Sequence, residues 1–474
     1  MPLFERRPTG AAVCALLCSL LSLTSVGAAR AQTASPQTTA SPWSLRQLVG
    51  ADDRLKLSAT ARIRFDTIDG QPRPGFNASD DVWNLRTTLF AEYDAGPVRF
   101  GTELYDSRAY GGDARTPIST NEINVAEVVQ AYAAVDLDAP FGAGTTATVQ
   151  VGRFVLNLGS RRLVAADDYR NTTNGYTGLR ADITGRDGLR AIAVYVLPTQ
   201  RLPDDLPSLL DNAYGSDREG SDTRLWGGVV TWNGLFGPVG AEVSYFRFDE
   251  RDNETRTTRD RALDTVGGRI FRPAAGGSWD FEVEAFQQWG SISAATAPTA
   301  ATLDVSAGFF HADVGYGFDR PMKPRISLRY DWVSGDKPGQ NYERFDTLYG
   351  MRRAEIAPSG LYNAVGRANL SSPAIRMEWL PTPATDAFIS YRPLWLASRT
   401  DSFSTSSVRD VTGRSGAFAG HQIELRVRHW LVRDALRLEV GTLHLARGQF
   451  LKTAPNAPDT GDTSYSSLNV TAFF

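Results

Sequence analysis

Arginine and glycine lie close together in one stretch of the chain, Gln150–Arg180. Gly152 precedes Arg153, and the run Gly159-Ser160-Arg161-Arg162 follows; Arg180 lies in a second apolar run that starts at Tyr176. Glycine lets the backbone turn where a side chain would clash. The guanidinium group presents a rigid fork of donors that matches the two oxygens of a carboxylate. These residue types indicate a chain that can recognise acidic groups.

The whole sequence shares this bias toward arginine. Among its 50 basic residues only four are lysines, which leaves 46 arginines. Two explanations remain open: the codon usage of a GC-rich genome, or a need for bidentate recognition of carboxylates. The formal net charge is -3, so the chain lacks the basic balance that nucleic-acid binding requires.

The elements that must position these arginines are strands. From Leu55 to Phe65 apolar and polar residues alternate, and this period of two predicts a strand with two different faces. About 11 residues is also the length of a strand that crosses a membrane. The same alternation recurs around residues 83–93, 279–285, 325–332, 423–428 and 436–440. One apolar face and one charged face suit lipid outside and water inside.

The connections between these runs also alternate. Short turns such as 95–97, 185–188 and 432–435 occupy every second join, and longer polar segments such as 198–222 and 334–368 occupy the others. We therefore expect an all-β fold: a transmembrane antiparallel β-barrel of about 18 strands, with short periplasmic turns and long extracellular loops. The strands near 264–272 and 304–316 have weak patterns, so a count of 16 to 20 stays open. The terminal aromatic Phe474 is typical of a last strand read by the barrel assembly machinery.

A barrel of this size leaves an aqueous lumen unless its loops fill it. Alternation places a set of basic residues on the inward faces: Lys56, Arg62, Arg64, Arg86, Arg180, Arg329, Arg376, Arg392, Arg426, Arg428 and Arg437. Acidic residues share those faces: Glu92, Glu103, Asp182, Glu242, Glu282, Glu284, Glu378, Glu424 and Glu439. The arginines predict a ladder of weak sites for an anionic chain. The alternative is an ion-paired lumen that only stabilises the wall. Arg153 has the apolar parity of its strand, and a bulge at Gly152 would be needed to turn it inward.

The N-terminus predicts export from the cytoplasm. Arg6 and Arg7 precede the apolar run 11–26, and Ala29-Arg30-Ala31 completes a signal peptide over residues 1–31. Residues 32–53 are expected to form a flexible leader, with a short helix or plug-like segment in its second half, and residues 54–474 the barrel. Both cysteines lie in the signal peptide, so the mature chain has no cysteine for a disulfide, a nucleophile or a metal.

Five stretches resemble the alginate export family of outer-membrane barrels. They are 150–180 with its GR…GSRR pattern, 103–132 beginning ELYDSR, 280–290 ending QWG, 330–349 (YDWVSGDKPGQNYERFDTLY), and 391–424 beginning YRPLW. The SGD…FDTLY stretch is the most specific, and the order of the five supports the resemblance. It covers most of the mature chain.

The resemblance implies an eighteen-stranded monomeric channel that passes alginate, a polyuronate, across the outer membrane. Carried over by motif position, Arg153, Arg162, Arg180 and Arg329 would line the constriction. Asp336 and Asp346 lie in the most specific motif, and their loop position implies gating or structure. Because the family is broad, the resemblance leaves the substrate open.

The leading hypothesis is therefore an outer-membrane channel that passes an anionic polysaccharide or its fragments by passive diffusion along an arginine-lined lumen. The alternatives are a general porin, an uptake porin for small acids or aromatic compounds, and a plugged structural barrel. The expected partners are the solute, outer-membrane lipid and the assembly machinery, with no nucleic acid, cofactor or metal. An enzyme is disfavoured, because only four histidines exist and the one acid near them, Asp313 beside His311, fits two strand residues at a barrel rim.

Overall fold

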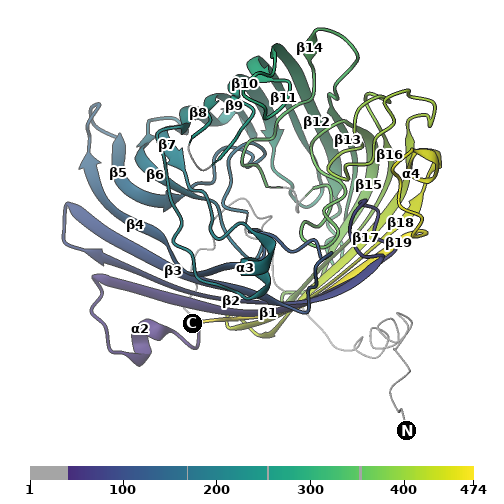
Figure 1. The fold of residues 1–474 in the computed structure, drawn as a ribbon. Coiled ribbons are helices and arrows are strands. Elements are labelled where there is room, and N and C mark those ends of the chain that lie inside the picture. Colours follow the sequence, from purple (N-terminus) through teal and green to yellow (C-terminus); the bar gives the residue numbers. More distant parts are fainter. Residues whose placement is uncertain (1–40, 168, 254–255, 352–354) are drawn as a thin grey trace.

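A ring of antiparallel strands surrounds chain segments that fold back into its interior (Figure 1). The structure is a computed structural model, and it describes residues 41–167, 169–253, 256–351 and 355–474. The expected signal peptide and residues 32–40 of the expected leader lie outside the described residues.

Eighteen strands form the wall, because each hydrogen-bonds to a wall strand on either side. They are β1 (Leu55–Asp69), β2 (Ser79–Asp94), β3 (Val98–Tyr110), β4 (Asn124–Asp138), β5 (Thr146–Val155), β6 (Gly175–Thr184), β7 (Leu189–Pro198), β8 (Thr223–Phe236), β9 (Val239–Glu250), β10 (Ala262–Arg272), β11 (Ser278–Ser293), β12 (Thr302–Gly317), β13 (Arg325–Val333), β15 (Leu370–Thr382), β16 (Thr385–Trp395), β17 (Phe418–Val432), β18 (Leu436–Arg447) and β19 (Thr463–Phe473). A further two-residue strand, β14 (Asn341–Tyr342), lies parallel to β12 inside a long loop. The predicted count of about 18 is confirmed, and the two weakly patterned segments are the strands β10 and β12.

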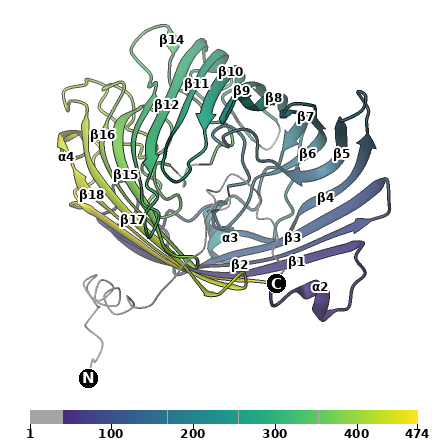
Figure 2. The same cartoon turned by 180° about the vertical axis from the view of Figure 1, so that it is seen from behind.

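The first and last strands close the ring. β1 pairs with β2 along one edge and with β19 along the other, in antiparallel register from Thr60↔Phe473 to Asp69↔Ser464. Figure 2 shows the same closure from behind. A closed sheet has no unpaired edge, so every strand finds hydrogen-bond partners on both sides.

The wall carries its apolar residues outward, opposite to the arrangement of a protein with a dry core. On β13 the side chain of Leu328 is 66% exposed, whereas Ser327 and Asp331 on the inner face are buried. Trp83 and Trp289 are also exposed on the outer face. The predicted two-faced strands are therefore confirmed. Among the described residues, no helix is long and apolar enough to cross a lipid bilayer.

The buried core lies inside the ring, between the wall and the long loops. Segments 156–174 and 334–369 fold inward, and their apolar residues Leu156, Val164 and Tyr362 are fully buried against inward wall residues such as Phe248. The two segments also bond to each other: the amide of Ala165 donates to the carbonyl of Tyr349 at 3.1 Å. The sequence alone left open how much of the lumen the loops fill.

Gly350 shows how closely these two segments approach. A Cβ atom built on Gly350 would lie 1.8 Å from the carbonyl oxygen of Arg162, a distance that no side chain can occupy. Its amide donates to the carbonyl of Thr347 at 2.9 Å, and the next amide, Met351, donates to Arg161 at 3.0 Å. Glycine is therefore required where one loop crosses the other.

The short helices of the described chain lie before β1 and in loops between strands. They are α2 (Leu45–Leu48), α3 (Leu206–Leu210) and α4 (Gln449–Thr453). α2 confirms the short helix expected before the barrel. The ring of the preceding Trp43 stacks on Phe474, and the hydroxyl of Ser41 donates to the carbonyl of Phe473 at 2.8 Å. The start of the described chain thus packs on the end of the closing strand.

The loop 199–222 contains a buried acid whose ionisation opposes folding. Asp217 is 7% exposed; it accepts hydrogen bonds from the amide of Leu202 at 3.0 Å and from Asn124 Nδ2 at 2.9 Å. Burial raises the pKa of Asp217 to about 6, because these two bonds only partly replace water around the carboxylate. Between about pH 4 and pH 6 the folded loop therefore holds a proton that the unfolded loop releases, so its stability falls as the pH rises.

At pH 7, Asp217→Asn is expected to raise the free energy of opening of the loop 199–222 above that of the parent protein, by up to about 3 kcal/mol. At about pH 4 the two proteins should have the same free energy of opening. The amide keeps the bond from Leu202. If the Asn124 side chain flips, its Oδ1, which has no partner among the described residues, can accept from the new amide. Hydrogen exchange of the loop amides, corrected for the intrinsic rate at each pH, measures the difference. Equal protection of the two proteins at pH 7 would contradict this account.

Candidate functional site

Arginines of the wall hold the inward-folded segment 156–174. Arg62 on β1 donates to the carbonyl of Arg170 at 2.6 Å, and Arg64 donates to the carbonyl of Tyr169 at 2.7 Å. Arg86 on β2 also reaches the carbonyl of Arg170, at 3.2 Å. Three of the predicted lumen arginines therefore point inward and grip the segment 156–174 across the ring.

Arg62 and Arg86 stand directly opposite each other on the paired strands β1 and β2. Like charges in that position destabilise a sheet unless something else holds them. The loop carbonyls and Asn171 Oδ1, which accepts from Arg62 at 3.0 Å, supply that support. The wall thus concentrates positive charge at this point although Arg62 and Arg86 repel each other across the strand pair.

Arg162 is the centre of a buried cluster of charges between the two inward loops and the wall. Its guanidinium is 3% exposed and forms ion pairs with Glu284 of the wall, with Glu282 at 2.5 Å, and with Glu355 of the loop 334–369. Arg367, on the same loop, forms a second ion pair with Glu355. One buried guanidinium therefore joins both inward loops to strand β11.

The charges in this cluster stabilise one another. Burial alone would raise the pKa of Glu355, but Arg162 and Arg367 hold the pKa of that carboxyl well below its ordinary value. Burial alone would likewise lower the pKa of Arg162, but Glu355, Glu282 and Glu284 raise it well above its ordinary value. Glu355 and Arg162 are therefore charged at every physiological pH, and removing either would leave an uncompensated buried charge.

A histidine lies next to this cluster. His311 Nδ1 is 2.7 Å from an oxygen of Asp331, whose other oxygen accepts from Arg392 at 2.7 Å. Asp313, the neighbour expected to face His311 along the strand, instead pairs with Arg329 at 2.6 Å and with Arg325. His311 and Asp331 are both buried in the wall, within a set of structural ion pairs.

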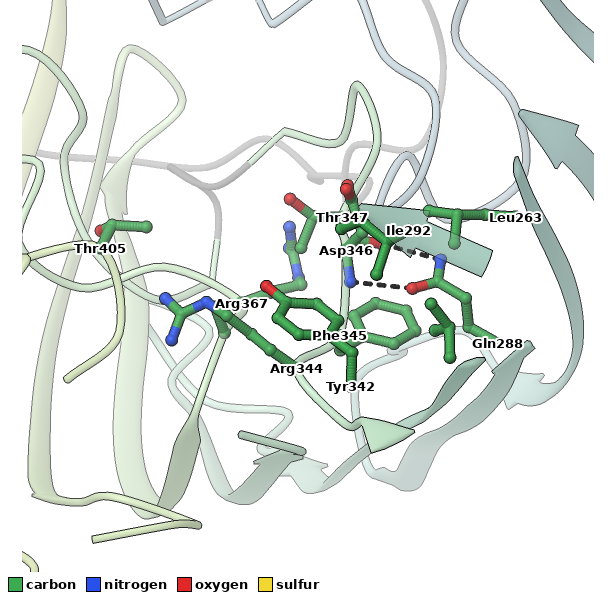
Figure 3. Close-up of a pocket in the computed structure, with 12 residues that line it drawn as sticks. Leu263, Gln288, Ile292, Tyr342, Arg344, Phe345, Asp346, Thr347, Arg367 and Thr405 are labelled. Carbon is green, nitrogen blue, oxygen red and sulfur yellow. Dashed lines mark hydrogen bonds between the residues drawn. The ribbon is translucent and has the colours of Figure 1, made fainter. Parts of the chain in front are cut away.

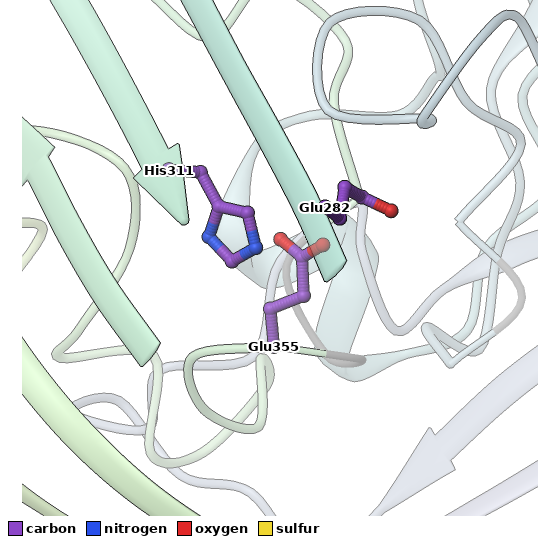
Figure 4. Close-up of side chains that lie close together, drawn as sticks. All are labelled: Glu282, His311 and Glu355. Atoms are coloured by element: carbon purple, nitrogen blue, oxygen red, sulfur yellow. The ribbon is translucent and has the colours of Figure 1, made fainter. Parts of the chain in front are cut away.

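Glu282, His311 and Glu355 converge closely enough to suit a metal ion (Figure 4). Their nearest ligand atoms all lie within 4.8 Å of one another. However, the guanidinium of Arg162 already bonds both carboxylates, and Arg367 bonds one of them. The cation that these residues hold in this structure is therefore an arginine side chain.

A second group of arginines lines the wall from β15 to β18. Arg376 pairs with Glu378 at 2.8 Å and lies 3.5 Å above the ring of Phe388. Arg426 and Arg428 both pair with Asp386 at 3.0 Å. Inward arginines continue around the closure on β18, β1 and β2, and inward acids share these strands: Glu378 pairs with Arg376, Asp386 with Arg426 and Arg428, and Asp66 with Arg64. Further inward acids, Glu242, Asp280, Glu282, Glu284 and Asp313, lie on β9, β11 and β12.

Arg437 on β18 differs from the other inward arginines. Its guanidinium lies over the rings of Trp430 and Phe473, at 5.5 and 5.2 Å from their centres. Within the described part of the chain, no carboxylate lies within ion-pair distance of it. Its charge is therefore less neutralised than that of its neighbours.

The remaining predicted residues lie elsewhere. Arg180 faces the lumen and pairs with Asp182 at 2.5 Å. Arg153 pairs with Glu127 and with Glu219 at 2.7 Å, and it keeps the parity of the exposed Val149 and Val151, with no register shift across β4 and β5. The predicted constriction residues are thus not brought together: Arg162 is at the centre, whereas Arg153, Arg180 and Arg329 lie at separate places on the wall.

Both predicted loop acids anchor the loop 334–369. Asp346 accepts from Arg261 at 2.5 Å, and its backbone exchanges two hydrogen bonds with the side chain of Gln288 on β11 (Figure 3). Asp336 accepts from the amide of Glu343 at 3.1 Å. These contacts fix the most specific sequence motif against the wall.

Sequence reasoning missed the loop residues Glu355 and Arg367. Alternation assigns inward residues only on strands, so a loop that re-enters the lumen gives no signal of period two. The one available indication was composition: the segment 355–370 contains more apolar residues than a solvent-exposed loop requires.

Solved structures of outer-membrane porins share this fold. The outer-membrane protein OpdK of Pseudomonas aeruginosa matches with a TM-score of 0.54 and 11% identity, over 88% of this chain and 99% of its own. A BenF-like porin of Pseudomonas fluorescens Pf-5 matches with 0.57 and 11%, over 89% and 99%. OccK2 (OpdF) of Pseudomonas aeruginosa, solved in complex with glucuronate, matches with 0.53 and 14%, over 89% and 96%. No curated protein matches this sequence.

The model of the family described as alginate export matches residues 53–461, which is most of the chain. The family and the porin-like barrel together place the protein in the outer membrane as a transport channel. The protein belongs to the alginate export family.

Proposed function

We propose that this channel passes an anionic polysaccharide of the polyuronate type, or its fragments, by passive diffusion past an arginine-lined wall. It would act as a monomer after cleavage of the signal peptide at residue 31. The single observation that carries the proposal is the set of inward arginines on β15 to β18 and, across the closure, on β1 and β2. A chain of carboxylates would travel along these arginines.

The inward arginines make this movement energetically plausible because each already binds an oxygen ligand. Arg426 and Arg428 share the single carboxylate of Asp386, and Arg86 binds a backbone carbonyl. A solute carboxylate can replace or share such a partner at little cost, since the guanidinium exchanges one oxygen ligand for another. Many weak sites of this kind allow entry and release.

The alternative is a general porin, or an uptake porin for small acids or aromatic compounds. The porins with the same fold support it, among them the one solved with glucuronate and the BenF-like one. The in-folded loops also favour it, because a narrow lumen suits small solutes better than a polymer. Single-channel recordings in a planar bilayer discriminate the two. A polyuronate channel should be blocked and crossed by a long oligouronate, whereas an uptake porin should be blocked and crossed only by a monomeric acid.

Arg437→Gln is expected to lower the preference for anions by about twofold. A unit charge about 8 Å from a permeating ion in water contributes about 0.5 kcal/mol, and Arg437 has no carboxylate that neutralises it directly. The reversal potential under a salt gradient measures the anion-to-cation permeability ratio.

The matched control for that variant is Arg433→Gln, which removes the same charge from an exposed turn next to β18. It should leave the ratio unchanged. If both variants behave alike, the inward arginines do not set selectivity, and the arginine-lined path is wrong.

Glu355→Gln is expected to enlarge the single-channel conductance and to increase its fluctuation. The substitution breaks the ion pair that joins the loop 334–369 to Arg162, and the pair of Glu355 with Arg367 within the loop; breaking a buried pair costs about 3–5 kcal/mol. Glu343→Gln is the control, because Glu343 lies on the same loop but pairs with the exposed Lys337. A conductance equal to that of the parent in both variants would show that this cluster does not narrow the path.

A further inference from the structure

A cavity lies between the segment 342–347 and the inner face of β10 to β12 (Figure 3). Its volume is about 210 Å³, which is below the range of drug-sized ligand pockets and suits one small ring. It is lined by Leu263, Gln288, Ile292, Val305, Tyr342, Arg344, Phe345, Asp346, Thr347, Arg367, Ala368 and Thr405. Tyr342, Arg344 and Thr405 also line a neighbouring cavity of about 360 Å³.

Most of the charged groups in this cavity are already used. Arg344 holds Asp401 at 2.7 Å and the carbonyl of Ser402 at 3.0 Å, so it ties two loops together. Asp346 is neutralised by Arg261. The side-chain amide of Gln288 donates to the carbonyl of Asp346 and accepts from its backbone amide. None of these groups can turn toward a ligand without releasing the loop.

Arg367 is the exception. Its side chain is 2% exposed, and its two terminal nitrogens bond the carbonyl of Met351 and the carboxylate of Glu355. Its Nε has no hydrogen-bond partner among the described residues. A buried charged donor without an acceptor is costly, so an acceptor supplied by a ligand in the cavity would be stabilised at this position.

The rest of the lining is typical of a sugar site. Tyr342 and Phe345 present aromatic rings, which suit the C–H face of a pyranose, and Thr347 and Thr405 supply hydroxyls. Arg259 lies 4.8 Å above the ring of Tyr342 and adds positive charge at the neighbouring cavity. Phe345 is fixed in place by stacking against Phe286 and Phe309, so the pocket floor is rigid.

We propose that this cavity binds a single uronate unit, with its carboxylate on Arg367 Nε and its ring against Tyr342 and Phe345. The site rests on the proposed function, because it would hold one unit of the transported anion beside the constriction. Arg367 bonds Glu355, and Glu355 bonds Arg162, so the bound unit lies one side chain away from the cluster that closes the lumen. The ligand is either a free hexuronate or the terminal unit of a chain.

The test uses purified full-length protein in a planar bilayer, with a monomeric hexuronate added on the side of the long loops. We expect brief interruptions of the current, and none with a neutral hexose of the same size. Arg367→Lys keeps the charge but removes Nε, and it should shorten the interruptions at least tenfold. An oligouronate used in place of the monomer should give interruptions at least as long if a terminal unit also binds.

Thr347→Trp is a second variant, at a lining residue that forms none of the ion pairs described above. No hydrogen bond of its side chain is seen among the described residues, and the larger ring would fill the cavity, so the interruptions should disappear. Arg414→Gln removes an exposed loop arginine that does not line the cavity, and it should behave as the parent.

The outcomes separate the two proposals. If hexuronate interruptions persist in Thr347→Trp, or if Arg367→Lys matches Arg414→Gln, the uronate site is wrong, and the channel can still carry anions. If no uronate of any length blocks or crosses the parent protein while the channel conducts, the proposed function itself fails.

Discussion

The closure of β1 on β19 is the constraint on which the other features depend. In hydrocarbon no water can satisfy a free backbone N–H or C=O group, so a sheet in the membrane must have no edge. Ten paired residues, from Thr60↔Phe473 to Asp69↔Ser464, remove that edge. Once the ring is closed, the environment of both faces of every strand is fixed: one face contacts lipid, and the other faces the interior of the barrel.

An interior of eighteen strands is too wide for side chains of the wall to fill alone. The protein fills it with two re-entrant loops, and it holds them by charge as well as by apolar packing. Arg62 and Arg64 reach from the wall to loop carbonyls, and Arg162 reaches from a loop to the acids of β11. If water enters the lumen, such polar contacts lose less of their stabilising free energy than apolar packing would. The reason is that water can hydrogen-bond to each of the polar partners. A lumen built in this way can remain partly hydrated and still hold its loops.

The sequence predicted the wall well because the wall has a simple physical rule. A residue such as Leu328 must face lipid and its neighbour Arg329 must not, and the resulting period of two can be read without a structure. The exact strand ends were less accessible: β8 ends at Phe236 and β9 begins at Val239, and such a tight two-residue connection leaves few polar residues to mark it. The loops could not be predicted, because neither the inward course of segment 334–369 nor the pairing of Glu355 with Arg162 follows from any local pattern. The same reason explains Asp313, whose partner is set by the register between β12 and β13 and not by its neighbour in sequence.

The preference for arginine over lysine acquires a physical reason in the closed lumen. Arg162 contacts three carboxylates and Arg325 contacts Asp280, Asp313 and Glu378, which a lysine ammonium could not do in the same fixed plane. The guanidinium is also more weakly hydrated, so exchanging one carboxylate for another costs less desolvation than it would at an ammonium. The property that lets arginine build the wall is therefore the property that an anion needs in order to pass along it. Codon usage alone would scatter arginines without regard to face, whereas arginines of many wall strands, such as Arg62, Arg329 and Arg376, lie on the inner face, and the two explanations for the bias are not exclusive.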